Sequence, residues 1–182
     1  MNIIAISGKA RNGKDTFANL LKDALEEDGS SVLIAHYADA VKYVCRTFFG
    51  WDGVKDEYGR SLLQYVGTDI VRKQQPDFWV KFLSDILCMF SDEWEYVLIP
   101  DVRFPNEIEY MRRAGFPVTH LRVTRPGFDN GLSEQQKSHP SETALDDCMP
   151  DAVIYNSGSL EDLKDSAIRW IKEYHHEEKQ LL

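Results

Sequence analysis

The segment GKARNGKDT, residues 8–16, sets the strongest limit on how this chain can fold. The short apolar run Ile3–Ile6 leads directly into it, and apolar residues at helical spacing follow from Phe17 onward. The spacing G-x-x-x-x-G-K between a buried strand and a helix is typical of a loop that binds phosphate groups. Its glycines let the backbone curl so that successive N–H groups point at phosphate oxygens, and the start of the helix adds the positive end of its dipole. We therefore expect a phosphate-binding loop here, with Lys14 bridging the β- and γ-phosphates of a nucleotide.

One position of this loop departs from the usual pattern. The residue after the lysine is normally Ser or Thr, whose hydroxyl group ligates magnesium, whereas here it is Asp15, with Thr16 next. A carboxylate is also a hard oxygen ligand, so Asp15 is expected to hold Mg²⁺ directly or through a water molecule. The departure therefore affects the expected metal geometry more than the expected nucleotide site.

Strand-like and helix-like segments alternate along the chain. The expected strands are Ile3–Ile6, Ser31–Tyr37, Tyr96–Ile99, Val118–Val123 and Ala152–Tyr155. One helix is expected between the loop and Gly29, another between Pro105 and Gly115, and a last one after Ser159, which caps it. This alternation predicts an α/β fold with three layers, in which a five-stranded, mostly parallel sheet carries helices on both faces. Ligands of such sheets bind outside the carboxyl ends of the strands.

Two longer stretches interrupt this alternation. Residues 38–94 have mainly helical patterns, and glycines that include Gly59 are expected to break them. Residues 125–150 contain three prolines and two glycines with weak periodicity. A loop of that length inside a compact domain is usually a functional lid or a disordered insertion. Because no linker or internal repeat is present, we expect one domain over residues 1–182 with a helical insertion and a lid.

The charge balance limits the kinds of partner to expect. The 182 residues include 21 Lys and Arg against 30 Asp and Glu, which gives a formal net charge of −9. Affinity for DNA or RNA rests on neutralising many phosphates, so no nucleic-acid polymer is expected, whereas a small phosphorylated ligand needs only a local cationic pocket. Three widely spaced cysteines predict neither a disulfide framework nor a zinc site. The apolar start is too short for a signal peptide or a membrane span, so we expect a cytoplasmic protein without a membrane partner.

A second group of polar residues follows the predicted strand that ends at Ile99. Asp101 comes first, and Arg103, Asn106 and Glu107 follow within a few positions. An aspartate at such a strand end, beside a phosphate-binding loop, holds magnesium or its waters, and Arg103 presents a fork of N–H groups that suits a phosphate. Read alone, the same residues could serve the next helix, with Asp101 or Asn106 as its cap and Glu107 favouring its dipole. The loop at residues 8–16 favours the functional interpretation.

Phosphoryl transfer also needs cations around the transferred group, because negative charge spreads over its oxygens in the transition state. The candidates are Arg60, Arg72, Arg122 and Arg125. Arg125 opens the 125–150 segment and would swing in with it if that segment closes as a lid, which would also exclude water. His139 either contacts substrate or precedes a capped helix that starts at Ser141.

Taken together, these motifs resemble those of the deoxynucleoside monophosphate kinases of bacteriophages, a branch of the phosphate-loop (P-loop) kinases. The segments that carry the resemblance are Gly8–Thr16, Tyr37–Lys42, Gly59–Asp69, Asp101–Glu107, His139–Thr143 and Asn156. The most specific parts are the loop ending in Lys-Asp-Thr and the block Asp-Val-Arg-Phe-x-Asn-Glu. Animal phosphomevalonate kinases look similar around the same loop and the His-Pro-Ser-Glu segment, so the resemblance leaves two classes of acceptor open.

The resemblance implies a P-loop NTPase fold and transfer of a phosphoryl group from ATP, with Mg²⁺, to a (deoxy)nucleoside 5′-monophosphate. The residues expected to bind ATP are Gly8, Lys9, Arg11, Asn12, Gly13, Lys14, Asp15 and Thr16. The residues expected to be catalytic are Lys14, Asp101, Arg103 and Arg125, with Asp15 and Asp101 placing the metal. The residues expected to bind the acceptor are Asp39, Lys42, Arg60, Gln64, Arg72, Arg103, Glu107, His139 and Glu142. Residues 38–94 would then be the acceptor-binding insertion.

Two alternatives stay open at this point. The acceptor could be another small phosphorylated molecule, such as phosphomevalonate or dephospho-coenzyme A. The chain could also be a nucleotide-binding module without transfer, although a cluster of candidate arginines is more than binding alone requires. The partners to expect are small-molecule nucleotides, and a homodimer is compatible with the sequence.

Overall fold

The computed structural model describes residues 1–180, and its centre is a sheet of five parallel strands in the order β2-β3-β1-β4-β5. The strands are β1 (Asn2–Ser7), β2 (Val32–Ile34), β3 (Tyr96–Ile99), β4 (Val118–Thr124) and β5 (Ala152–Tyr155). Every pairing between neighbouring strands is parallel. The α/β sheet predicted from the sequence is therefore confirmed, with all of its strands parallel rather than most of them.

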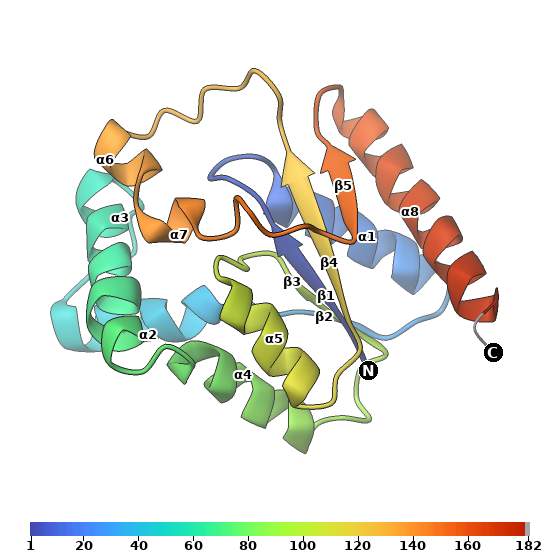
Figure 1. The fold of residues 1–182 in the computed structure, drawn as a ribbon, viewed down its shortest axis with the longest axis horizontal. Helices are drawn as coiled ribbons and strands as arrows, with labels where there is room; N and C mark the ends of the chain where they lie inside the picture. Colours follow the sequence, from blue (N-terminus) through green and yellow to red (C-terminus); the bar gives the residue numbers. More distant parts are fainter. Residues whose placement is uncertain (181–182) are drawn as a thin grey trace.

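Helices cover both faces of the sheet (Figure 1). One face packs against α1 (Lys14–Glu27) and α8 (Leu160–Gln180), and the other against α2 (Tyr37–Phe49), α4 (Phe78–Met89) and α5 (Pro105–Arg113). Alternate residues of β1 divide between these two cores, because successive side chains of a strand point to opposite faces. Ile4 and Ile6 lie in the first core, and Ile3 and Ala5 lie in the second. This is the predicted three-layer arrangement.

The predicted helical stretch also contains α3 (Glu57–Gln64) and the π-helical segment η1 (Tyr65–Arg72). The prediction that Gly59 breaks this stretch is wrong, because Gly59 lies inside α3. A Cβ at this position would collide with the carbonyl of Val54 and come within 2.7 Å of Trp51 Nε1. Gly59 therefore allows a close approach of two segments and does not end a helix.

The second strand is shorter than predicted. It ends at Ile34, and Tyr37, which was expected to close the strand, is the first residue of α2. The backbone N–H groups of Tyr37 and Ala38 both donate to the carboxylate of Asp101, which follows β3. The carboxylate of Asp101 thus caps the N-terminus of this helix from a distant position in the sequence. The local sequence pattern around Tyr37 does not indicate this partner.

Residues 125–150 cross the carboxyl edge of the sheet (Figure 1). They contain two short helices, α6 (Glu134–Lys137) and α7 (Pro140–Thr143), joined by irregular backbone. α7 lies near the loop between β1 and α1, and α6 lies near α3. Among residues 1–180, no helix combines the length and the apolar character needed to cross a membrane.

Candidate active site

The loop between β1 and α1 has backbone angles that favour glycine. Gly8 has φ 142° and Gly13 has φ 92°, a region that residues with a side chain rarely adopt. A Cβ on Gly8 would collide with the carbonyl of Val123, and one on Gly13 would lie 2.5 Å from Asn156 Nδ2. Asn156 Nδ2 also donates to the Asn12 carbonyl at 3.0 Å. The two glycines therefore let β4 and the segment after β5 support the loop closely.

The loop ends at the N-terminus of α1, where a lysine is held in a nearly dry position. No side chain caps this helix end, so its first N–H groups remain for an anion. Lys14 is 6% exposed, and its Nζ donates to the Lys9 carbonyl at 2.9 Å. Burial is the main cause that lowers the pKa of Lys14 from 10.5 to about 7, and the nearby Arg103 adds to it, whereas Glu142 and Asp15 act in the opposite direction.

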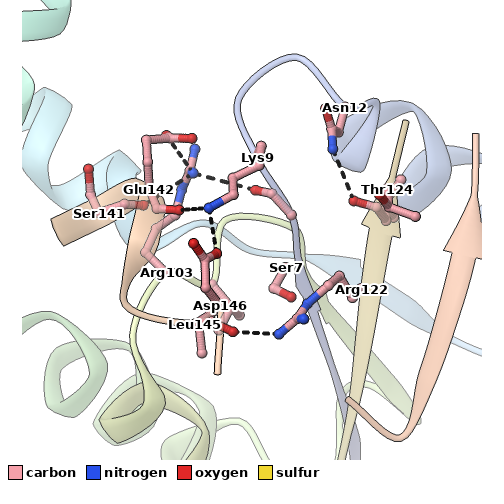
Figure 2. Close-up of a pocket in the computed structure, with 13 residues that line it drawn as sticks. Ser7, Lys9, Asn12, Arg103, Arg122, Thr124, Ser141, Glu142, Leu145 and Asp146 are labelled. Carbon is pink, nitrogen blue, oxygen red and sulfur yellow. Dashed lines mark hydrogen bonds and ion pairs between the residues drawn. The ribbon is translucent and has the colours of Figure 1, made fainter. Parts of the chain in front are cut away.

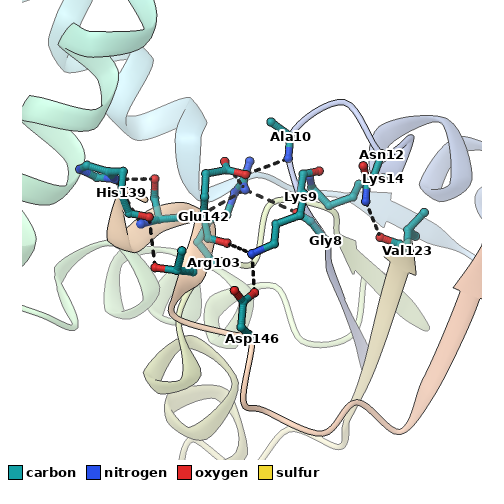
Figure 3. Close-up of polar contacts among 12 residues, drawn as sticks. Gly8, Lys9, Ala10, Asn12, Lys14, Arg103, Val123, His139, Glu142 and Asp146 are labelled. Atoms are coloured by element: carbon teal, nitrogen blue, oxygen red, sulfur yellow. Dashed lines mark hydrogen bonds and ion pairs between the residues drawn. The ribbon is translucent and has the colours of Figure 1, made fainter. Parts of the chain in front are cut away.

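The segment around α7 lies directly against this loop (Figure 3). The Ala10 N–H donates to Glu142 Oε2 at 2.9 Å, and Arg103 Nη1 donates to Glu142 Oε1 at 2.7 Å. Lys9 Nζ donates to the Glu142 carbonyl at 2.6 Å and forms an ion pair with Asp146. The side chain of Glu142 is only 6% exposed. Two cations expected to contact phosphates, Lys9 and Arg103, therefore contact residues 142 and 146 in this structure.

The sequence left two roles open for His139, contact with a substrate or a position before a short capped helix, and the structure shows the second. It precedes α7 as its cap, and its Nδ1 accepts from the Ser141 N–H at 3.2 Å. Its Nε2 lies 3.7 Å from Asp69 Oδ1. A contact between His139 and a substrate remains a prediction.

A cavity of about 150 Å³ lies between the loop and the α7 segment (Figure 2). Arg122 of β4 lines it, and its Nη2 donates to the carbonyls of Leu145 and Cys148, each at 2.5 Å. This arginine was expected among the cations around the transferred group. In the structure it binds the backbone that follows α7 and holds that segment against the sheet.

Ser7, which lines the same cavity, forms a buried pair with His120. Ser7 Oγ and His120 Nε2 are 2.8 Å apart, and both residues are at most 2% exposed. Burial, followed by the charge of Arg122, lowers the pKa of His120 to about 4. The histidine is therefore neutral at physiological pH, and its hydrogen bond to Ser7 holds the end of β1 directly before the loop.

A larger cavity of about 430 Å³ adjoins the other side of the loop, between α2, α3, η1 and α5. Most of the residues expected to bind the acceptor line it. Those from the sequence analysis are Arg11, Lys14, Asp15, Lys42, Arg60, Gln64, Arg72, Asp101, Arg103 and Glu107. Two further charged or titratable residues that the sequence analysis did not single out, His36 and Lys55, also line it. A cavity of this size is in the range of small-molecule sites.

One wall of the large cavity is a buried ion pair. Arg72 Nη1 lies 2.9 Å from Glu107 Oε1, and its Nη2 donates to Asn106 Oδ1 at 2.6 Å. The guanidinium also lies over the ring of Phe104, 3.7 Å from its centre. Burial raises the pKa of Glu107 to about 7, although the charge of Arg72 opposes this. The wall is thus a fixed platform on which Arg72 has a preset orientation.

The two expected metal-binding carboxylates lie on the same side of the loop. Asp15 is exposed and its Oδ1 lies 3.0 Å from His36 Nε2, which lowers the pKa of Asp15 and raises that of His36. Burial raises the pKa of Asp101, whose two oxygens accept the amides of Tyr37 and Ala38. Among the side chains that the structure describes, those of residues 1–176, no group of three or more His, Cys, Asp or Glu is placed to hold a metal ion.

Five expected site residues line neither cavity: Gly13, Thr16, Asp39, Arg125 and the His139 described above. Asp39 is exposed and accepts from Lys42 Nζ at 2.7 Å. Arg125 is exposed and its guanidinium lies 4.0 Å from the centre of the Phe128 ring. Thr16 lies exposed in the first turn of α1. Their expected roles in binding or catalysis remain predictions.

Comparison with known proteins decides which family this arrangement represents. A family model described as "Deoxynucleotide monophosphate kinase" matches residues 51–167. The chain belongs to this family. The matched range begins after the phosphate-binding loop and includes the helices α3 to α5 and the α7 segment. Membership of the deoxynucleotide monophosphate kinase family confirms the resemblance inferred from the sequence.

Individual relatives agree with the family assignment. The deoxynucleotide monophosphate kinase of enterobacteria phage T4 is 36% identical over 115 residues, which are 62% of this chain and 45% of that protein. The chain thus matches about half the length of this relative. The phosphomevalonate kinase of Drosophila melanogaster is 28% identical over 179 residues, 88% of this chain and 91% of that protein.

Solved structures support the fold. The Mycobacterium tuberculosis APS kinase CysC, in complex with AMPPNP and APS, has a TM-score of 0.56 and 15% sequence identity. The alignment covers 94% of this chain and 97% of that one. The P-loop kinase fold expected from the sequence is therefore confirmed.

Proposed function

We propose that this member of the deoxynucleotide monophosphate kinase family transfers the γ-phosphoryl group of ATP to a (deoxy)nucleoside 5′-monophosphate, giving the nucleoside diphosphate and ADP. The observation that carries the proposal is a single juxtaposition. The phosphate-binding loop, with Lys14 at its end, forms one wall of a 430 Å³ cavity whose other walls hold three arginines. A kinase needs this arrangement, because the two phosphates must meet beside the loop in a site lined with positive charge.

The loop supplies the binding site for ATP in this proposal. The N–H groups at residues 13–16 and the dipole of α1 would face the triphosphate, and Lys14 would contact the β- and γ-phosphates. Lys14 would leave its present partner, the Lys9 carbonyl, for a phosphate oxygen. A bound phosphate favours the ammonium form of Lys14, because its negative charge stabilises the positive charge that burial disfavours.

The insertion supplies the binding site for the acceptor. Arg60 of α3 and the adjoining Lys55 line the large cavity, and among the described residues neither has an ion-pair partner. Arg60 Nε donates to the Lys55 carbonyl at 3.1 Å, so the two cations are held together. Arg72, by contrast, is already paired with Glu107. We therefore assign the acceptor phosphate to Arg60 and Lys55, and the wall near the acceptor nucleoside to Arg72 and Gln64.

The proposed reaction is an in-line displacement. An oxygen of the acceptor phosphate attacks the γ-phosphorus, the bond from that phosphorus to the bridging β–γ oxygen breaks, and ADP leaves with the bonding electrons. The acceptor phosphate is already ionised at neutral pH, so no strong general base is required. Arg103, and Arg125 from the 125–150 lid, would stabilise the charge on the transferred group. Water has to be excluded during transfer, which is the function we assign to that lid.

The residues present fit the magnesium ion that such kinases use. Magnesium in these sites takes one or two protein carboxylates and obtains its other ligands from phosphates and water, so it needs no complete protein cage. Asp15 is exposed beside the loop, and hydrogen bonding to His36 lowers its pKa, which keeps it anionic at neutral pH. Asp15 would hold the ion, with Asp101 orienting its waters. When bound, the ion would neutralise charge on the β- and γ-phosphates.

An assay of ADP release, with a panel of deoxy- and ribonucleoside monophosphates as acceptors, tests the proposal. Acceptor-dependent turnover is expected with at least one of them. Lys14→Ala should lower that turnover by a factor of about 100 or more, as loss of one electrostatic contact to the reacting group does. Lys172→Ala, on the exposed face of α8, is the matched control and should behave like the parent chain. No turnover with any nucleotide would remove the nucleotide-kinase assignment.

A second acceptor class has a specific observation in its favour. The alignment with the Drosophila phosphomevalonate kinase extends over 88% of this chain, more than the alignment with the phage T4 kinase does. We therefore include phosphomevalonate in the acceptor panel. Turnover with this compound alone would assign the chain to that reaction, and turnover with nucleotides alone would exclude it.

A further inference from the structure

The carboxylate of Glu142 occupies a position built for an anion. Its two oxygens each accept one hydrogen bond, from the Ala10 N–H at 2.9 Å and from Arg103 Nη1 at 2.7 Å. The first donor belongs to the phosphate-binding loop, and the second is an arginine whose Nη1 also lies 3.5 Å from the Gly8 carbonyl. The side chain is 6% exposed, so these contacts are largely shielded from water. The chain thus places one of its own negative charges against its phosphate-binding groups (Figure 3).

The charges around Glu142 explain why it stays there. Lys14 and Arg103 are close enough for the charge of Arg103 to lower the pKa of Lys14, and Glu142 is the first of the carboxylates that oppose this effect. Two neighbouring cations in a nearly dry site need a negative partner. Glu142 supplies that partner while the loop holds no phosphate. A bound phosphate would supply the same charge, and it would repel a carboxylate that shared the same donors.

We propose that Glu142 is an internal counter-anion in a phosphate subsite made by the Ala10 N–H and Arg103, and that an incoming phosphate group displaces it. This proposal rests on the assignment of the loop as the ATP site, but not on the identity of the acceptor. Glu142 then does not contact the bound substrate in this role. Instead, Arg103 changes its partner from Glu142 to phosphate.

The same exchange would loosen the segment that carries Glu142. Lys9 Nζ contacts the Glu142 carbonyl and the side chain of Asp146, so both contacts are made to the same short segment as the displaced side chain. The backbone bonds of this segment are short-range, from Glu142 N to the His139 carbonyl at 2.8 Å and from Ala144 N to the Pro140 carbonyl at 2.9 Å. Binding of phosphate at the loop is therefore linked to release of residues 139–146 from their present position, a step that precedes closure of the lid over the bound nucleotide.

Calorimetric titration with inorganic pyrophosphate, without a metal ion, tests the exchange on the whole chain. Glu142→Gln keeps the shape of the side chain but removes its charge, so pyrophosphate meets weaker competition for Arg103. Charge-assisted hydrogen bonds exceed neutral ones by about 1 kcal/mol, which corresponds to a roughly fivefold tighter Kd in the variant. Asp147→Asn is the matched control: it removes an exposed negative charge from the same segment, at a residue that lines neither cavity, and should change the Kd less than about twofold.

The outcomes separate clearly. Weaker or unchanged pyrophosphate binding by Glu142→Gln would overturn the proposal, and so would equal tightening by Asp147→Asn, because the effect would then be general electrostatics. Hydrogen exchange of the unmodified chain gives a readout that needs no variant to fold. Saturating pyrophosphate should accelerate exchange of the amides at residues 142–146, and slower or unchanged exchange there would contradict the proposal. Failure of the ADP-release assay would leave these binding results standing, so the two proposals fail separately.

Discussion

Glu107 Oε2 accepts the backbone N–H of Arg103 at 2.7 Å, while the other oxygen of the same carboxylate faces Arg72. One buried carboxylate therefore fixes the main chain of one arginine and the side chain of another. It also accepts the N–H of Phe104, the N-cap residue of α5, at 3.0 Å, and so caps the start of that helix. The two walls of the large cavity that carry Arg72 and Arg103 are thus joined through Glu107.

Removing this carboxylate should destabilise the whole fold. Glu107→Ala leaves the Arg72 guanidinium buried without its partner, and breaking a buried ion pair in this way costs about 3–5 kcal/mol. Asp85→Ala, which breaks the exposed Lys81–Asp85 pair on α4, is the control and should cost at most about 1 kcal/mol. Denaturant unfolding of both variants measures the difference. Equal losses would mean that Glu107 contributes no more than a surface charge.

The pKa of Lys14 predicts how ATP binding depends on pH. Free Lys14 titrates near pH 7, and a bound phosphate favours its ammonium form, so binding above pH 7 takes up a proton. ATP affinity should then fall as pH rises from 7.5 to 9.5, by up to about tenfold per unit. Titration calorimetry in buffers of different ionisation enthalpy measures the proton uptake. Lys14→Arg, which stays charged throughout, should bind with no such uptake, and a flat profile in the parent chain would refute this account.

The two glycines with nearly equal φ offer a matched test of the loop. Gly13→Ala and Gly115→Ala both place a Cβ on a left-handed residue, with φ 92° and 93°, and each should cost about 1–2 kcal/mol of stability. At Gly115 nothing lies within 4 Å of the new Cβ, whereas at Gly13 it would lie 2.5 Å from Asn156 Nδ2. Only Gly13→Ala should therefore displace the loop, and a shift of about 1 Å costs about a hundredfold in rate. Comparable turnover by the two variants would argue against the loop as the ATP site.

His120 should make the fold sensitive to acid. The unfolded chain binds a proton at the ordinary histidine pKa of 6.5, whereas buried His120 does so only near pH 4. Between these values the unfolded state binds more protons, so this residue lowers stability as pH falls. Glu107 acts in the opposite direction between pH 4.5 and 7, because its pKa is raised on folding.

The contribution of His120 is separated from that of Glu107 by comparing variants. Denaturant unfolding at pH 7, 6 and 5 should show a steeper loss for the parent chain than for His120→Gln, in which Glu107 is unchanged. Lys172→Gln, at an exposed position on α8, serves as the control and should follow the parent chain. Parallel slopes for His120→Gln and the parent chain would count against a buried neutral histidine.

The elements that the sequence predicted well are those with local causes. The loop at residues 8–16 combines glycine spacing, a buried strand and a helix start, so both its conformation and its position were accessible. The strands β3 and β5 were predicted with their observed bounds because turn residues flank their apolar runs. Gly115 with Pro117 marked the end of α5 for the same reason.

One error arose where a distant residue decides the local structure. Asp101 holds the start of α2 from a position 64 residues further along the chain, so Tyr37 belongs to the helix instead of the strand, and no local pattern indicates this partner. The error at Gly59 has another origin. Glycine was expected to break a helix, whereas here it leaves room inside α3 for the close approach of Val54 and Trp51.

The site was predicted in part. The expected cations at Lys14, Arg60, Arg72 and Arg103 do line one cavity, since strand ends and the insertion meet at one edge of the sheet. Lys55 carried no signal, because an isolated lysine before a helix is usually a surface residue. His36 lay inside the strand predicted over Ser31–Tyr37, near its carboxyl end, and this position at the ligand-binding edge was a signal that was not used. The contacts of Glu142 with the loop depend on how residues 125–150 cross the sheet, which periodicity does not encode.

Three consecutive residues of the loop have partners far along the chain. Lys9, Ala10 and Arg11 contact residues that follow them by between 119 and 137 positions. During synthesis the strand and loop are made well before Asn130, Glu142 and Asp146 have been translated. The nucleotide site is therefore begun long before its polar partners exist, and a nascent polypeptide carries an incomplete site until Asp146 has been added.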